Sequence, residues 1–188
     1  MATIYLFRHG QTHYNKGRIF TGWKDSTLTP TGIKQAKQLS LLLKDKKIDI
    51  AYHSRLSRSK DTLRQVLKSH PECKQIYKDD RIIERNYGKL SGFSHQTIIN
   101  EFGQKQFDKW HRSWDERPPQ GESFADVALR VGDFIKNLKS KYSGKNVSIV
   151  ISAHGNSIRA FRKIMEKSTE SEASSWKIPY DQYFEYKI

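Results

Sequence analysis

The 188-residue sequence contains one cysteine, Cys73, and therefore no Cys-x-x-Cys pair. A single cysteine excludes an intrachain disulfide and excludes the redox and zinc motifs that need paired cysteines. The chain also lacks a run of about 20 apolar residues, and its N-terminus lacks the basic start and apolar core of a signal peptide. We therefore expect a cytoplasmic protein with no membrane partner.

Two further absences narrow the function. Neither Gly-x-x-x-x-Gly-Lys-Ser/Thr nor Gly-x-Gly-x-x-Gly occurs, so the sequence lacks the common phosphate-binding loops of nucleotide-binding proteins. Acidic residues are few, because 34 Lys and Arg face 20 Asp and Glu, which gives a net charge of +14. Such a charge attracts phosphometabolites, nucleic acid and acidic membranes without choosing among them. No helix-turn-helix, zinc or RNA-binding signature is present, so no specific nucleic-acid partner is expected.

Short apolar runs alternate along the chain with segments of helical periodicity. Strands are predicted at 4–7, 48–52, 75–78, 147–153 and 182–186. Helices are predicted from 30 to about 43, from about 54 to 70, within 94–114 with a break near Gly103, from 124 to 138, and from 156 to about 165. This alternation predicts an α/β fold with a mainly parallel central sheet and helices on both faces. The length suits a single domain spanning residues 1–188.

Two histidines stand where buried strands end. His9 follows the predicted strand 4–7, and His154 follows the predicted strand 147–153. Because ligands of open α/β sheets bind outside the carboxyl ends of the strands, we expect the two imidazoles to share one pocket. Glu84 lies in a polar loop after another candidate strand and is expected at the same edge.

These residues fit phosphoryl transfer without a metal, which needs a nucleophile, cations for the equatorial oxygens and a proton donor. His9 is the predicted nucleophile, since a neutral imidazole attacks phosphorus and gives a phosphohistidine. Arg8 and Arg58 are predicted to clamp the phosphoryl oxygens bidentately. A protonated His154 would add positive charge, and the amides of the helix that begins near Asn156 favour an anion.

Five blocks carry a more specific pattern. They read RHGQTHYN at 8–15, FTGWKDSTLTPTG at 20–32, SRLSR at 54–58, ERNYGKLSG at 84–92 and AHGNSIRA at 153–160. In these blocks the chain resembles the histidine phosphatase superfamily and, within it, the cofactor-dependent phosphoglycerate mutases. The resemblance extends from Ile4 to the C-terminus and implies a phosphoglycerate mutase-like fold.

The resemblance also implies roles for individual residues. His9 would carry the phosphoryl group, Glu84 would be the general acid and base, and the phosphoryl group would be surrounded by Arg8, Arg58 and His154. The substrate pocket would be formed by Gly10, Thr12, Asn15, Thr21, Gly22, Arg85, Tyr87, His95, His111, Arg112, Gly155 and Asn156. No metal is implied, and 2,3-bisphosphoglycerate would prime the histidine. The implied reaction interconverts 2- and 3-phosphoglycerate in glycolysis and gluconeogenesis.

Three positions depart from the mutase pattern. Asn86 stands where mutases usually carry histidine, His95 replaces a substrate-binding lysine, and His111 replaces the first of two arginines. A neutral histidine removes a fixed charge near pH 7, and a charge-assisted hydrogen bond is worth roughly 1.5–3 kcal/mol. Lys89 and Lys105 are close in sequence and are candidates to compensate.

Two other functions remain open from the sequence. The missing cations motivate a histidine phosphatase that hydrolyses small phosphate esters, and the chain also lacks the long insertion that many mutases carry near Pro119. The charge of +14 motivates a polyanion-binding protein on a dead enzyme fold. That third hypothesis ranks last, because the complete catalytic set is present. We expect a small phosphorylated anionic substrate, and the sequence leaves the oligomeric state open.

Overall fold

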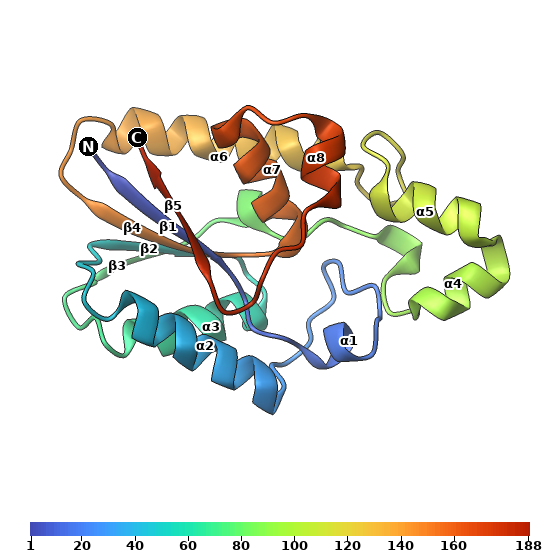
Figure 1. Ribbon diagram of the computed structural model, residues 1–188, viewed down its shortest axis with the longest axis horizontal. Coiled ribbons are helices and arrows are strands. Elements are labelled where there is room, and N and C mark those ends of the chain that lie inside the picture. The colour runs from blue at the N-terminus through green and yellow to red at the C-terminus, as the bar shows by residue number, and fades with distance from the viewer.

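The computed structural model describes residues 1–188 and is organised around a five-stranded sheet (Figure 1). The strand order is β3-β2-β4-β1-β5. Neighbouring strands among the first four are parallel, and the last strand runs antiparallel to β1. The strands are β1 (Thr3–Arg8), β2 (Ile50–His53), β3 (Gln75–Lys78), β4 (Ser148–Ala153) and β5 (Tyr183–Lys187).

The register of the central strands brings the two strand-end histidines together. Arg8 of β1 pairs with Ala153 of β4, so both strands end at the same level. The amide of His9 then donates a hydrogen bond of 3.0 Å to the carbonyl oxygen of Ala153. His9 and His154 are thus adjacent although 145 positions separate them.

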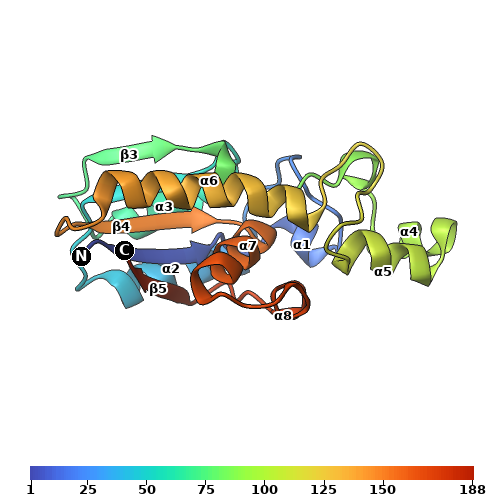
Figure 2. The same ribbon diagram turned by 90° about the horizontal axis from the view of Figure 1, so that it is seen from above.

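Helices cover both faces of the sheet (Figures 1 and 2). One face carries α6 (Phe124–Tyr142), α7 (Gly155–Glu166) and α8 (Glu170–Ser175), and the other carries α2 (Pro30–Leu43) and α3 (Ser57–Leu67). The first layer buries a cluster of 19 apolar residues and the second a cluster of 10. Each fully buried Leu, Ile or Phe side chain contributes roughly 1.5–3 kcal/mol, so these two clusters hold the sheet edge in place.

A helical hairpin extends beyond the carboxyl edge of the sheet (Figure 2). It consists of α4 (His95–Phe102) and α5 (Gln104–Arg112), which meet at Gly103, a glycine with a φ of 81°. The hairpin packs on a separate cluster of six buried residues, Phe20, Tyr87, Leu90, Ile98, Phe107 and Trp110. It therefore forms one wall of the space outside the strand ends.

The predicted α/β class and mainly parallel sheet are confirmed, and most elements lie within a few residues of their predicted bounds. The helix predicted over 54–70 is shorter and spans only α3, because Ser54 is engaged in side-chain bonds at the strand end. The sequence patterns considered above did not predict α8, although Thr169 and Glu172 form its capping box. Also unpredicted are α1 (His13–Lys16) and two 3₁₀ turns, Asp80–Ile82 and Gly88–Leu90. No helix is both long enough and apolar enough to cross a membrane.

Candidate active site

A cavity of about 640 Å³ opens at the carboxyl edge of the sheet. Four cationic side chains line it, and Glu84 is its one carboxylate. This excess of positive charge suits a ligand with more than one anionic group. The four cations are Arg8, Arg112, Arg159 and Lys177.

His9 is 2% exposed and does not line the cavity, but it directly follows Arg8, which does. We call the buried region around His9 the inner end of the cavity. Its Nδ1 donates a 2.8 Å hydrogen bond to the carbonyl oxygen of Gly10, and its Nε2 accepts a 3.3 Å bond from Nε of Arg58. Burial, together with Arg58 and Arg8, holds the pKa of His9 well below 6.5. The imidazole is therefore neutral near pH 7, with its proton on Nδ1 and its lone pair on Nε2. That is the form in which histidine attacks phosphorus.

Arg58 uses much of its guanidinium to hold the chain between α1 and α2. Nη2 donates to the carbonyl oxygen of Gly22 at 2.8 Å, and Nη1 donates to that of Lys24 at 2.9 Å. With the bond to His9, three of its five N–H groups are engaged, so two remain for an anion. Burial lowers the pKa of Arg58 to about 10, and the group stays charged at neutral pH. Arg58 therefore holds both the loop and His9 in position.

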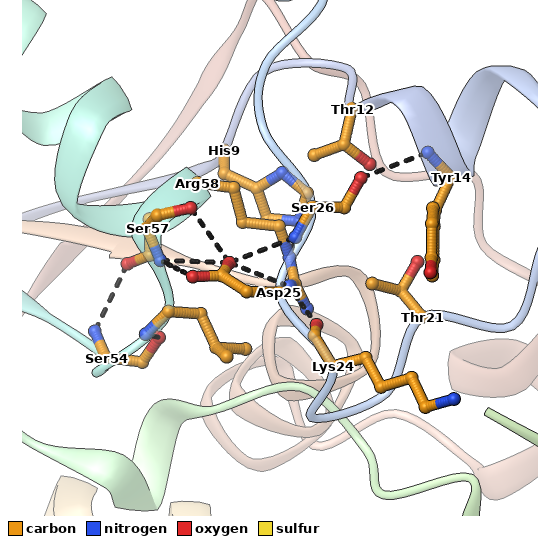
Figure 3. Close-up of polar contacts among 12 residues, drawn as sticks. His9, Thr12, Tyr14, Thr21, Lys24, Asp25, Ser26, Ser54, Ser57 and Arg58 are labelled. Atoms are coloured by element: carbon orange, nitrogen blue, oxygen red, sulfur yellow. Dashed lines mark hydrogen bonds and ion pairs between the residues drawn. The ribbon is translucent and has the colours of Figure 1, made fainter. Parts of the chain in front are cut away.

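Asp25 fastens the same loop to the beginning of α3 (Figure 3). Its carboxylate accepts from the backbone amide of Ser57 at 3.1 Å and from the Ser57 hydroxyl at 2.8 Å. The carboxylate also lies 3.8 Å from Nη1 of Arg58. A carboxylate at a helix N-terminus is stabilised by the free amides and the dipole, so this contact orders the loop beside His9.

His154 lies next to His9, with 4.9 Å between the ring centroids, and is completely buried. Its Nε2 is 2.7 Å from Oγ of Ser54, whereas its Nδ1 has no partner. Burial, Arg58 and His9 hold the pKa of His154 well below 6.5. In this arrangement His154 is neutral, because a buried imidazole among cations favours the neutral form. The protonated form expected beside a phosphoryl group stays a prediction. The unpartnered Nδ1 is the atom available to a phosphoryl oxygen once an incoming anion raises that pKa.

Glu84 is held by backbone amides from two distant segments. Its Oε1 accepts from the amide of Arg85 at 2.8 Å and from the amide of Asn156 at 3.1 Å. The amide at the start of α7, expected to serve a ligand, thus binds this carboxylate instead. Oε2 makes no hydrogen bond within the protein, and Glu84 lines the cavity. This oxygen is suitably placed to exchange a proton with a ligand.

The wall formed by the α4–α5 hairpin carries two histidines, His95 and His111, whose rings contact each other and Phe20 in tilted or edge-on arrangements. The ring of Phe20 lies 4.4 Å from that of His95 and 5.7 Å from that of His111. Burial and the nearby Arg112 lower the pKa of His111 to about 3, and burial with Arg18 and Arg112 lowers that of His95. Both imidazoles are neutral near pH 7, so at this wall the fixed positive charge comes from Arg112.

Most residues assigned to the site from the sequence do meet at the cavity. The lining includes Arg8, Asn15, Thr21, Gly22, Glu84, Tyr87, His95, His111, Arg112, Gly155 and Asn156. Three residues assigned to the chemistry are buried and do not line the cavity: His9, Arg58 and His154.

Three predicted substrate-binding residues lie outside the lining and have supporting contacts. Gly10 packs so closely on Gly32 that a Cβ atom would come within 2.3 Å of the Gly32 carbonyl oxygen. Thr12 donates its hydroxyl to the side chain of Asn15 at 3.0 Å and so fixes a residue that does line the cavity. Arg85 donates to backbone carbonyl oxygens at 2.6 and 3.0 Å. The structure gives these residues a role in shaping the pocket.

Several lining residues were not assigned from the sequence: Ile19, Phe20, Arg159, Lys177, Ile178, Pro179 and Tyr180. Arg159 lies in the recognised block 153–160, one helical turn beyond Gly155, and this spacing was the available signal. Burial and Arg112 lower the pKa of Arg159 to about 10, so it remains a cation. The segment around Lys177 carries no motif.

Neither lysine proposed to compensate for the missing cations, Lys89 or Lys105, lines the cavity. The structure also contains no group of three or more His, Cys, Asp or Glu side chains placed to hold a metal ion. The charge at the site therefore comes from arginine and from Lys177.

The profile of the histidine phosphatase superfamily (branch 1) matches residues 4–185, and the chain belongs to this superfamily. The resemblance found in the sequence blocks is thereby confirmed. Phosphoglycerate mutase of Schizosaccharomyces pombe is 39% identical over 170 residues, covering 88% of this chain and 80% of the relative. The 2,3-bisphosphoglycerate-dependent phosphoglycerate mutase of Cytophaga hutchinsonii is 37% identical over 169 residues, covering 89% and 78%.

Solved structures similar to this chain include phosphatases. Bacillus stearothermophilus YhfR has a TM-score of 0.86 and 27% identity, covering 96% of this chain and 88% of that one. A mycobacterial glucosyl-3-phosphoglycerate phosphatase also has a TM-score of 0.86, with 24% identity and coverage of 97% and 90%. At that identity the second likeness concerns the fold alone.

Proposed function

We propose that this enzyme interconverts 2-phosphoglycerate and 3-phosphoglycerate through a phosphohistidine at His9, as a step of glycolysis and gluconeogenesis in the cytoplasm. The observation that carries the proposal is a neutral His9 at the inner end of a cavity lined by four cations and one carboxylate. Phosphoglycerates bear a phosphate and a carboxylate, which matches that charge. Relatives named as phosphoglycerate mutases, at 31–39% identity, support the same choice.

The proposed chemistry needs few groups. Starting from the phosphorylated enzyme, Glu84 takes the proton of the substrate hydroxyl as its oxygen attacks phosphorus and the phosphorus–Nε2 bond of His9 breaks. Nε2 then attacks the other phosphate, and Glu84 returns the proton to the departing oxygen. The proton of His9 stays on Nδ1 throughout, where it is donated in a hydrogen bond to the Gly10 carbonyl oxygen. The equatorial oxygens are held by Arg8, by the two free N–H groups of Arg58 and by His154.

The residues present also fit a polyanionic priming donor. The buried Nδ1 of His154 lacks a partner, and the lining cations outnumber the lining carboxylates by four to one. When bound, 2,3-bisphosphoglycerate would supply the phosphoryl group that primes His9. Arg8, Arg112, Arg159 and Lys177 are the side chains that would hold it.

A single assay tests the proposal. The protein is given 3-phosphoglycerate with a trace of 2,3-bisphosphoglycerate, and both 2-phosphoglycerate and inorganic phosphate are measured over time. We expect 2-phosphoglycerate to accumulate with little phosphate release. Phosphate release without isomerisation would contradict the mutase proposal.

A histidine phosphatase is the second candidate, and two observations favour it. His95 and His111 are neutral, so they hold an acidic substrate less firmly than fixed cations would. Glucosyl-3-phosphoglycerate phosphatase also shares the fold. In that case Glu84 would activate water against phosphorylated His9. The polyanion-binding hypothesis stays last, because His9, Glu84 and the buried partners are intact and mutually arranged.

A further inference from the structure

The segment that joins α8 to β5 forms a wall of the cavity and contains no recognised sequence motif. Four of its residues line the cavity, from Lys177 to Tyr180. Alternate backbone carbonyl oxygens, from Ser174 near the end of α8 into this segment, each accept hydrogen bonds from an arginine that also lines the cavity. The bonds run from Arg112 to Ser174 at 2.9 Å, from Arg159 to Trp176 at 2.7 and 3.0 Å, and from Arg8 to Ile178 at 3.0 Å.

This arrangement places Lys177 differently from the other lining cations. The arginines direct part of their donor capacity to carbonyl oxygens, and Arg8 also stacks over the ring of Tyr180 at 4.0 Å. Lys177 lies between two of the bonded carbonyl positions, is exposed, and forms no hydrogen bond or ion pair with the protein. Its ammonium group is therefore unpaired while its backbone is held in place.

The α4–α5 hairpin contributes no lysine to the cavity lining. His95 and His111 contribute no charge near neutral pH, and Lys105 does not reach the lining. We propose that Lys177 is a specificity-determining residue that recognises the carboxylate of the substrate while the phosphate occupies the inner end of the cavity. This inference depends on the proposed function only in taking the substrate to be a phosphorylated carboxylic acid.

Two ligands that differ only at the carboxylate test the inference directly. Isothermal titration calorimetry compares 3-phosphoglycerate with glycerol 3-phosphate, which has a hydroxymethyl group in place of the carboxylate. Lys177→Ala should weaken 3-phosphoglycerate binding about tenfold and glycerol 3-phosphate binding less than about twofold, because only the first ligand loses a charge-assisted contact. Lys177→Arg should recover most of the loss.

Lys105→Ala is the matched control, since it removes an exposed lysine outside the cavity and should leave both affinities unchanged. Equal weakening of both ligands by Lys177→Ala would overturn the inference, since that pattern reports general electrostatics. No weakening of either ligand would also overturn it. If the wild-type protein fails to isomerise phosphoglycerate but the ligand contrast holds, the proposed function fails and the inference about Lys177 stands.

Discussion

The inner end of the cavity and its outer wall are built in different ways. At the inner end, His9, Arg58 and His154 are almost fully buried and are held by strand ends, a helix start and backbone carbonyl groups. The outer wall consists of the α4–α5 hairpin and the segment after α8. The hairpin is held by the separate cluster of six buried apolar residues described above. Burial keeps the histidines of both regions neutral, but only the outer wall carries exposed cations, Arg112 and Lys177. Under the proposed function, the chemistry and the choice of substrate therefore depend on separate parts of the molecule.

Among changes to the inner region, replacing the proposed nucleophile His9 should have the largest effect on activity. His9→Ala should abolish phosphoryl labelling of the protein and lower turnover by at least about 10⁴-fold, since no other group supplies the covalent step. His13→Ala removes an exposed histidine of α1 and should retain both. Labelling with ³²P-phosphoryl donor followed by acid and base treatment identifies the phosphohistidine. Undiminished labelling of His9→Ala would show that another residue is the acceptor.

A milder change separates loop position from chemistry within the inner region. Asp25→Ala removes the carboxylate that holds the loop on α3, and we expect kcat/KM to fall about tenfold and stability to fall by about 1 kcal/mol. Asp25→Asn, which keeps an acceptor oxygen, should recover part of the stability. Asp61→Ala removes an acidic residue of the same helix that is paired only with Arg64 and serves as the control. Kinetics and urea unfolding of the three variants give the comparison, and a null effect of Asp25→Ala would exclude the positioning role.

Histidines of both regions make stability depend on pH with the same sign. The pKa values of His9 and His154 lie well below 6.5 and that of His111 lies at about 3, so the unfolded chain binds more protons as the pH falls below 6.5. Their contribution is present above about pH 6.5 and decreases below it, by up to about 1.4 kcal/mol per pH unit for each histidine. The pKa of Asp126 is lowered to about 2, so its stabilising contribution is fully present above pH 3.8 and is lost as the pH falls from 3.8 toward 2.

Urea unfolding at about pH 7.5 and about pH 5 measures this effect. His111→Asn should flatten the dependence by the share of one histidine. An equal slope in wild type and His111→Asn would mean that the outer wall does not shift the pKa of His111.

Salt should affect the outer region more than the inner one, and this is the smallest effect that we expect. Raising the ionic strength from ~0.05 to ~0.5 M should lower kcat/KM a few-fold while changing kcat little, because screening acts on exposed cations and on steering of an anionic substrate. Stopped-flow or steady-state rates with 3-phosphoglycerate provide the measurement. A parallel decrease of kcat would indicate that salt reaches the buried catalytic groups.

Most strands and helices and many residues of the candidate site could be predicted from the sequence, because the patterns that indicate them are local. Apolar runs and helical periodicity reveal strands and long helices, and short blocks such as RHGQTHYN carry the nucleophile with its neighbours. The same locality explains the omissions. Lys177 stands in a segment with no motif, and Arg159 was passed over although it lies in a recognised block.

Sequence alone was sufficient to predict the α/β class, the superfamily and the meeting of His9, Glu84 and His154 at one edge of the sheet. The sequence was not sufficient to predict the protonation states and hydrogen-bond partners of the site residues. The neutral form of His154, the use of the Asn156 amide by Glu84 and the carbonyl contacts of Arg58 all depend on segments that are far apart in the chain. The pKa of a group and the partners of a donor follow from burial and from neighbours in space, which exist only once the chain has folded.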